Sequence, residues 1–151
     1  MSKDRIEVIC TDFRLYRPEE KFDTIVSNPP YFVDSLACPD KQRSTARHNQ
    51  SLTYAELIEG AAALLTDRGE LMMVLPTDVE ERVREVAMCN GLHAIRQLNV
   101  ITKPGGEPKR TLIAFSFQQQ ECLTEQLLTE RSRHQYSDEY IALTREYYLN
   151  M

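Results

Sequence analysis

Three features that define other classes of protein are missing from this sequence of 151 residues. No run of apolar residues approaches the length of a membrane span, and the N-terminus lacks the apolar stretch of a secretory signal. The four cysteines show no C-x-x-C spacing, which argues against a metal knuckle or a disulfide framework. We therefore expect a soluble, cytoplasmic protein with reduced thiols, no metal site and no membrane partner.

The sequence also lacks an excess of basic residues, and its formal net charge is -5. Nucleic acid would therefore have to bind to a local basic patch. What the sequence does contain is enough hydrophobic residues, 42%, for one domain with a core.

Strands and helices alternate along the first part of the chain. Apolar, β-branched runs bounded by polar residues predict strands at residues 5–10, 22–27 and 69–76. Capping boxes that open with Thr53 and Asp78 predict helices at residues 53–68 and 78–89. Gly91 then supplies a left-handed stop. This order of elements is typical of an α/β fold with a parallel sheet.

The pattern changes after Gly91. Residues 92–101 and 110–117 flank a short connection rich in glycine and proline, which predicts an antiparallel hairpin closing one end of the parallel sheet. Residues 137–150 predict a C-terminal helix with Ser137 as its N-cap. We expect the tyrosine stripe of this helix to dock onto the sheet rather than to contact a cofactor.

The stretch Asn28-Pro29-Pro30-Tyr31 directly follows the predicted strand 22–27, where open α/β sheets bind ligands. A strand-ending turn explains both prolines but neither the amide nor the aromatic ring. An amine-modifying site explains all four residues. The Asn28 side-chain oxygen and the Pro29 carbonyl can accept two hydrogens from a conjugated amine and turn its lone pair toward an electrophile. Tyr31 offers a face for a flat ring.

These four residues resemble the N-P-P-Y signature of the S-adenosylmethionine-dependent amino-methyltransferases, which act on adenine N6, cytosine N4 or the glutamine amide. One branch, the tRNA1(Val) adenine-37 N6-methyltransferase family, is similar over residues 5–151. The similar stretches are FDTIVSNPPYF, CPDKQRSTARH, GELMMVLP, KPGGEPKRTLIAFSF and YSDEYIALTREYYLNM. The resemblance implies the C-terminal part of a Rossmann-like methyltransferase sheet, S-adenosylmethionine as cofactor and tRNA as partner. The implied reaction methylates N6 of an adenine beside the anticodon of a valine tRNA.

The resemblance also implies roles for single residues. Asn28, Pro29, Pro30 and Tyr31 would be catalytic, Asn28 would also contact the cofactor, and Asp12 would contact the cofactor's adenine. From its position alone, Asp12 is equally a turn-forming or N-capping residue. Basic residues near the turn and the hairpin are candidates for contacts with phosphate, and each is equally well explained as a solvated surface charge: Lys41, Arg43, Arg47, Lys103, Lys109 and Arg110.

The sequence departs from the family pattern in its glycines. The fold holds its cofactor at a glycine-rich turn after the first strand, but the first glycine here is Gly60. We therefore expect residues 1–151 to be a partial methyltransferase domain without that strand and turn. Such a chain should bind S-adenosylmethionine weakly or not at all. It should also self-associate through an exposed sheet edge or leave residues 1–20 poorly packed.

Two other functions remain open at this point. The same four residues would serve a protein glutamine N5-methyltransferase, although the C-terminal tail and the stretch with Lys41, Arg43 and Arg47 favour tRNA over protein. A partial domain could also be a non-catalytic tRNA-binding remnant.

Overall fold

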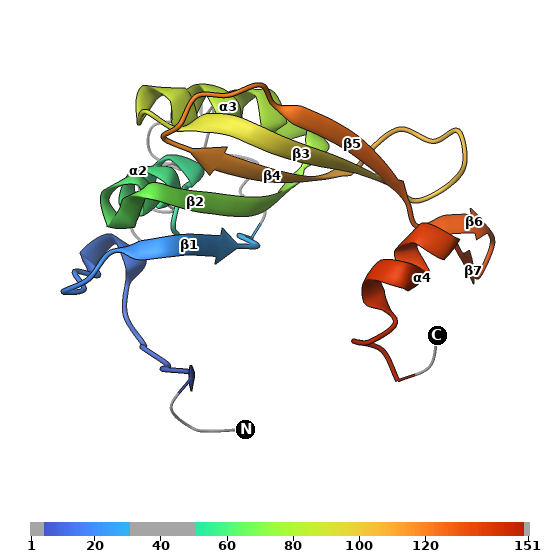
Figure 1. Ribbon diagram of the computed structural model, residues 1–151, viewed down its shortest axis with the longest axis horizontal. Helices are drawn as coiled ribbons and strands as arrows, with labels where there is room; N and C mark the ends of the chain where they lie inside the picture. Colours follow the sequence, from blue (N-terminus) through green and yellow to red (C-terminus); the bar gives the residue numbers. More distant parts are fainter. Residues whose placement is uncertain (1–4, 31–50, 150–151) are drawn as a thin grey trace.

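The computed structural model describes residues 5–30 and 51–149, which form a mixed five-stranded sheet in the order β1-β2-β4-β3-β5 (Figure 1). The strands are β1 (Phe22–Ser27), β2 (Leu65–Pro76), β3 (His93–Ile101), β4 (Arg110–Ser116) and β5 (Leu123–Leu128). β1 is parallel to β2, and β3 is parallel to β5, whereas β4 is antiparallel to both of its neighbours. The predicted α/β fold and its hairpin are confirmed. β5, which was not predicted, pairs with β3 and extends the sheet beyond the hairpin, so the prediction that the hairpin closes one end of the sheet is wrong.

Helices α2 (Tyr54–Leu64) and α3 (Glu80–Cys89) share one core with the sheet. Alternate residues of β2 point toward these helices, so that Leu71, Met73 and Leu75 are almost completely buried. Met72 and Leu112 lie on the other face and are 37% and 39% exposed. Among the residues that the structure describes, no helix has the length and apolar character needed to span a bilayer.

The predicted capping of α2 is confirmed. The Thr53 hydroxyl accepts a hydrogen bond of 3.1 Å from the Glu56 backbone N–H. Leu65 ends the helix in an extended conformation and is also the first residue of β2, which therefore begins four residues earlier than predicted. Gly60 lies inside α2 against Phe13, where an added Cβ would stand 2.6 Å from a ring carbon. The glycine thus allows close packing of the preceding segment on the helix.

The predicted N-cap of the next helix is wrong. Asp78 lies inside a short 3-10 turn, η3 (Thr77–Val79), and α3 begins after it without a side-chain cap. Pro76 and the backbone hydrogen bond from Thr77 to Lys109 hold the chain at the end of β2, so the turn forms first. The predicted stop at Gly91 is confirmed by its φ of 78°.

The predicted strand at residues 5–10 is also wrong. Residues 6–10 form neither helix nor strand, and Val8 is 89% exposed. Within the described part of the chain no strand pairs with this segment, and β1 is paired only with β2. A β-branched sequence forms a stable strand only with a partner for its backbone groups. Figure 1 shows the segment leading away from the sheet.

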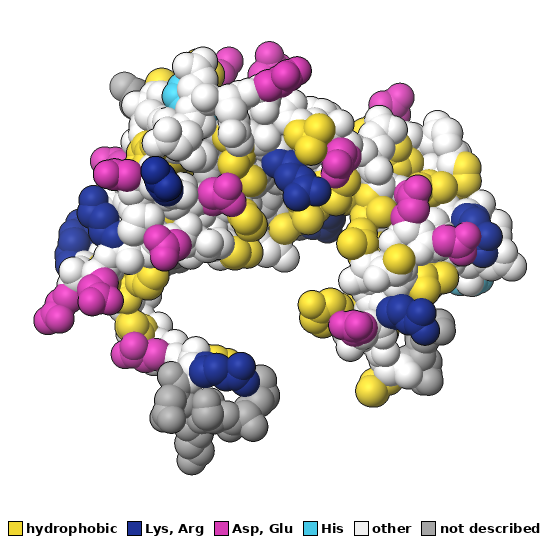
Figure 2. Space-filling view, viewed as in Figure 1, with side chains coloured by type: hydrophobic (Ala, Val, Ile, Leu, Met, Phe, Trp, Pro, Cys, Tyr) yellow, Lys and Arg dark blue, Asp and Glu magenta, His cyan; other side chains and the backbone are white. Residues whose placement is uncertain are grey.

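The C-terminal residues form a small lobe, which consists of β6 (Glu130–Ser132), β7 (Gln135–Tyr136) and α4 (Asp138–Thr144). Ser137 caps α4 as predicted, by accepting a hydrogen bond of 3.1 Å from the Tyr140 N–H. The predicted docking of the tyrosine stripe is wrong, because α4 contains no buried residue and Tyr147 is 84% exposed. The β6–β7 hairpin carries the helix away from the sheet (Figure 1). Figure 2 shows the hollow between this lobe and the N-terminal segment.

Candidate methyl-acceptor site

The Asn28-Pro29-Pro30 turn lies at the carboxyl end of β1, a strand that is parallel to its neighbour. Pro29 is buried, whereas Asn28 is exposed. The buried ring fixes the backbone next to an accessible amide, which is the arrangement that an amine-binding turn requires. Tyr31 lies outside the described residues, as do Lys41, Arg43 and Arg47, so their predicted roles stay predictions.

The hairpin cations lie at the same end of the sheet as this turn. Ser27, the last residue of β1, is opposite Met73, and β2 then continues to Pro76, which is opposite Arg110 of β4. Arg110 and the neighbouring Lys109 are exposed, as is Lys103. The structure therefore brings three of the six predicted cations to the end of the sheet at which Asn28 lies.

Asp12 is held by a neighbouring arginine. Its carboxylate caps η2 (Phe13–Leu15) by accepting a 3.0 Å hydrogen bond from the Arg14 N–H. The Arg14 guanidinium donates to both carboxylate oxygens of Asp12 and contacts Glu56 at 3.5 Å. Hydrogen bonding from Arg14 lowers the pKa of Asp12, which keeps the carboxylate charged. The N-capping interpretation is therefore confirmed, and the cofactor contact stays a prediction.

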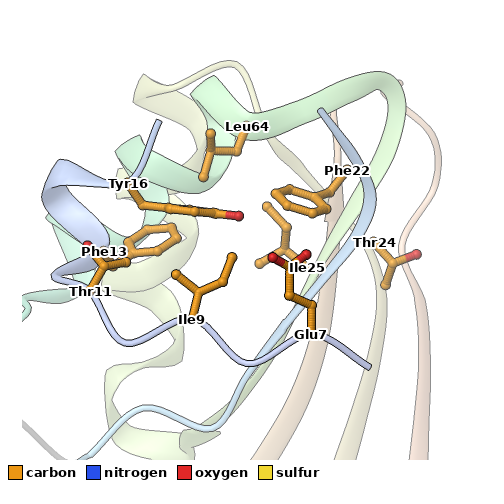
Figure 3. A pocket seen from close by; sticks show the side chains of 9 residues that line it. All are labelled: Glu7, Ile9, Thr11, Phe13, Tyr16, Phe22, Thr24, Ile25 and Leu64. Atoms are coloured by element: carbon orange, nitrogen blue, oxygen red, sulfur yellow. The ribbon is translucent and has the colours of Figure 1, made fainter. Parts of the chain in front are cut away.

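A cavity of about 460 Å³ lies beside β1, and the sequence did not predict it. In Figure 3 the aromatic rings of Phe13, Tyr16 and Phe22 point toward one another across it. The rings of Tyr16 and Phe22 stack with centroids 6.4 Å apart. These aromatic residues lie in a segment without helical or strand periodicity, which leaves no pattern from which a shared wall could be predicted.

This cavity is not part of the acceptor site. The lining residues of β1 run from Phe22 to Ile25, and Asn28 follows the end of the strand, so at roughly 3.3 Å per residue they lie about 10 to 20 Å from Asn28. Asp12 does not line the cavity. Ligands of open α/β sheets bind at the other end of the strands. The cavity therefore represents apolar surface beside the unpaired edge of β1.

The described residues fit a methyl acceptor better than the methyl donor. Asn28 and Asp12 are the residues that would meet S-adenosylmethionine, and the Asp12 carboxylate is already engaged by Arg14. The first glycine among the described residues is Gly60. None of the described glycines lies in a turn that follows a strand on the open side of β1. A cradle for the methionyl part of the cofactor is thus not present among them.

Comparison with known proteins places the chain in a family. The family model of the Eco57I restriction-modification methylase matches residues 3–88. The chain belongs to this methylase family. A relative from Bacteroides thetaiotaomicron, named tRNA1(Val) (adenine(37)-N6)-methyltransferase, is 62% identical over 99% of this chain. A relative from Phocaeicola vulgatus with the same name is 50% identical over 99% of this chain. The resemblance seen in the sequence is therefore confirmed.

The chain spans 63% and 64% of the lengths of these two relatives. Among solved structures, a predicted O-methyltransferase from Agrobacterium tumefaciens superposes with a TM-score of 0.65 at 18% identity. The match covers 93% of this chain and 63% of that chain. At this identity the likeness shows a shared fold. The sheet described above is therefore shared with that structure.

Proposed function

We propose that this chain supplies the methyl-accepting part of an S-adenosylmethionine-dependent methyltransferase acting on N6 of an adenine beside the anticodon of a valine tRNA. The observation that carries the proposal is the exposed Asn28 beside the buried Pro29 at the carboxyl end of a parallel strand. The names of relatives that are 62% and 50% identical support tRNA as the substrate. A cytoplasmic location is consistent with such a substrate.

In the proposed mechanism, the adenine amine donates one hydrogen to the Asn28 side-chain oxygen and the other to the Pro29 carbonyl. Both acceptors draw the amine lone pair out of conjugation with the ring. Tyr31 stacks on the adenine after this base has flipped out of the stacked bases of the anticodon loop. S-adenosylmethionine, when bound, supplies an electrophilic methyl group. The proton of the resulting ammonium leaves to water, so no histidine or serine base is required.

We further propose that residues 1–151 are a partial domain, and that the glycine-rich turn holding the cofactor lies outside them. Two features of the described residues support this proposal: one edge of β1 has no partner strand among them, and the segment at residues 6–10 is exposed. The same edge would allow self-association of the isolated chain.

A non-catalytic tRNA-binding remnant is the second candidate, and the lack of a described glycine-rich turn favours it. The two functions are separated by replacing the 149 aligned residues of the Bacteroides thetaiotaomicron relative with the matching residues of this chain. We expect this hybrid to methylate a valine tRNA transcript, and not a transcript in which the target adenine is guanine. A hybrid that folds and binds S-adenosylmethionine, but methylates no tRNA, would support the remnant and contradict the enzyme.

A glutamine methyltransferase would reveal itself in the same experiment. The hybrid would then methylate a glutamine-containing protein acceptor and leave the transcript unmodified. The names of the relatives favour the opposite result.

A further inference from the structure

The helix-covered face of the sheet becomes polar toward the end that carries the basic loop. On β4, the buried Ile113 and Thr111 share this face, and Thr111, which is nearer to the loop, is 0% exposed. On β3, Gln97 pairs with Ile113, and Asn99 pairs with Thr111. Gln97 is 8% exposed. Polar side chains at such positions require partners, since an unpaired buried polar group is costly.

These partners form one continuous chain of hydrogen bonds. The Asn99 side-chain oxygen accepts from Gln97 at 2.9 Å and from the Thr111 hydroxyl at 3.1 Å. The Thr111 hydroxyl lies 3.1 Å from the Thr77 hydroxyl. Because the single hydroxyl proton of Thr111 goes to Asn99, Thr77 must donate to Thr111. The direction of the chain, from Thr77 through Thr111 to Asn99, is therefore fixed.

The far end of the chain is anchored on α3. The Gln97 side-chain oxygen accepts from Arg84, and Arg84 is also hydrogen-bonded to Glu80 of the same helix. Arg84 lies 3.6 Å from the Cys122 sulfur as well. The network thus joins a helix, two strands and the turn after β2, and satisfied networks of this kind fix one arrangement of the groups they link.

Thr77 connects the network to the basic loop at residues 102–109. The Thr77 backbone N–H donates to the Lys109 carbonyl at 3.0 Å, and the Lys109 N–H donates to Val100 at 3.3 Å. Replacing both partners of a buried hydrogen bond by apolar groups of similar shape is often nearly neutral for stability. Stability alone therefore does not account for a hydroxyl at Thr111.

We propose that Thr111 and Asn99 are positioning residues for RNA binding. They act through Thr77, and they set where Lys103 and Lys109 lie relative to Asn28. This inference rests on the proposed tRNA methyltransferase function and adds the residues that place its phosphate-binding loop.

The test compares Thr111→Val, which keeps the side-chain shape, with Thr111→Ser, which keeps the hydroxyl. Binding of a valine tRNA transcript to the 151-residue chain is measured where circular dichroism shows every variant folded. We expect Thr111→Val to bind about fivefold more weakly, and Thr111→Ser to bind like the wild type. Amide hydrogen exchange at Thr77 and Lys109 should be faster in Thr111→Val only.

Two further variants keep the test decisive. Thr124→Val makes the same chemical change at an exposed position of β5 and should alter neither measurement. Thr77→Val removes the hydroxyl at the half-buried end of the network and replaces Thr111→Val if that variant does not fold.

Equal binding and equal exchange in the valine and serine variants would overturn the positioning role and leave the proposed function intact. If the isolated wild-type chain binds no tRNA, binding is measured in the hybrid protein instead. A folded hybrid that also binds no tRNA would overturn the proposed function, and the exchange rate at Lys109 then decides whether Thr111 places the loop. Faster exchange in Thr111→Val then supports the placement of the loop, and unchanged exchange overturns it.

Discussion

At the scale of single residues, the chemistry of a side chain here is set by its immediate neighbour. The Asp12 carboxylate is fixed by the Arg14 guanidinium, with 2.6 Å between the closest oxygen and nitrogen. In the C-terminal lobe, the hydroxyls of Tyr140 and Tyr148 lie 3.5 Å apart, and the rings of Tyr136 and Tyr140 lie 5.2 Å apart. These tyrosines therefore form a cluster whose members can be tested by titration.

The hydrogen bond with Tyr148, followed by partial burial and the charges of Tyr148 and Tyr136, raises the pKa of Tyr140 to about 12. We expect Tyr148→Phe to move this pKa back toward the ordinary value of about 10. Ultraviolet absorbance of tyrosinate measures the change. Tyr147→Phe is the matched control, because Tyr147 is 84% exposed.

The sign of the effect on stability follows from the raised pKa. The stabilisation from this hydrogen bond is complete below pH 10, where Tyr140 is protonated in the folded and unfolded states alike. It is lost as the pH rises from 10 to 12. Identical titration curves for wild type and Tyr148→Phe would rule out the hydrogen bond as the cause.

At the scale of elements, α2 is the helix whose N-cap motif, recognisable in the sequence, lies next to the core. Its N-cap, Thr53, is 8% exposed, and the first helical residue, Tyr54, is 1% exposed. Burial raises the pKa of Tyr54, with a smaller contribution from the charge of Asp78, so this phenol stays neutral inside the core at physiological pH. The start of α2 is thus where capping and core packing meet.

We expect Thr53→Ala to lower the free energy of unfolding by about 1 kcal/mol, because the Glu56 N–H loses its acceptor. Urea denaturation measures the change. Thr53→Ser keeps the hydroxyl and should retain most of the stability. Equal stability of the alanine variant and the wild type would show that water replaces the cap without cost.

The basic loop at residues 102–109 gives a second prediction at this scale. If Lys103 and Lys109 both meet phosphates, their joint replacement by glutamine should weaken tRNA binding and reduce the slope of log affinity against log salt by about two. The control replaces Lys21 and Arg68, which lie before β1 and near the start of β2, away from Asn28. An unchanged slope in the loop variant would make these lysines ordinary surface charges.

Which elements could be predicted depended on where their stabilisation lies. α2, β1 and the β3–β4 hairpin carry local signals, namely a cap, a β-branched run and a turn rich in glycine. The segment at residues 6–10 has a strand-like composition but no strand partner among the described residues. β5 was missed because its first four residues are exposed and show no alternation. The place of α4 depends on the β6–β7 hairpin, whose short strands have no periodicity.

The candidate site was predictable for the same reason. Asn28, Pro29 and Pro30 are adjacent in the sequence and directly follow the predicted strand at residues 22–27, so their position at a strand end could be predicted from the sequence. The network of Thr77, Asn99 and Thr111 comes from three separate segments. The register between β3 and β4 places Asn99 beside Thr111, and the pairing of β2 with β4 brings Thr77, the residue after Pro76, to the same place.

At the scale of the whole molecule, the described residues leave apolar surface uncovered on one side. Val26 of β1 is 70% exposed, and Val8 of the N-terminal segment is 89% exposed. Hydrophobic side chains also gather over the strands in Figure 2. The chain spans 63% of the length of its Bacteroides thetaiotaomicron relative, so that relative has further residues with which to cover such a surface.

We expect the isolated chain to self-associate, because an unpaired strand edge and exposed apolar residues favour contact with a second copy. Light scattering at increasing concentration measures this association. Val26→Lys should reduce the association by placing a charge on β1. Val86→Lys places the same charge on the half-buried side of α3, away from this edge, and serves as the control. A wild-type chain that stays monomeric and binds S-adenosylmethionine stoichiometrically at micromolar concentration would contradict the proposal of a partial domain.

The central claim is that Asn28 binds the reacting amine. Its most direct test is the single-turnover rate of methyl transfer to valine tRNA by the hybrid protein, with and without Asn28→Ala. Loss of one of two acceptors should lower the rate about 100-fold while tRNA binding is retained. Gln119→Ala removes an exposed amide between β4 and β5 and should have no effect. An unchanged rate in Asn28→Ala would contradict the proposed role of this turn.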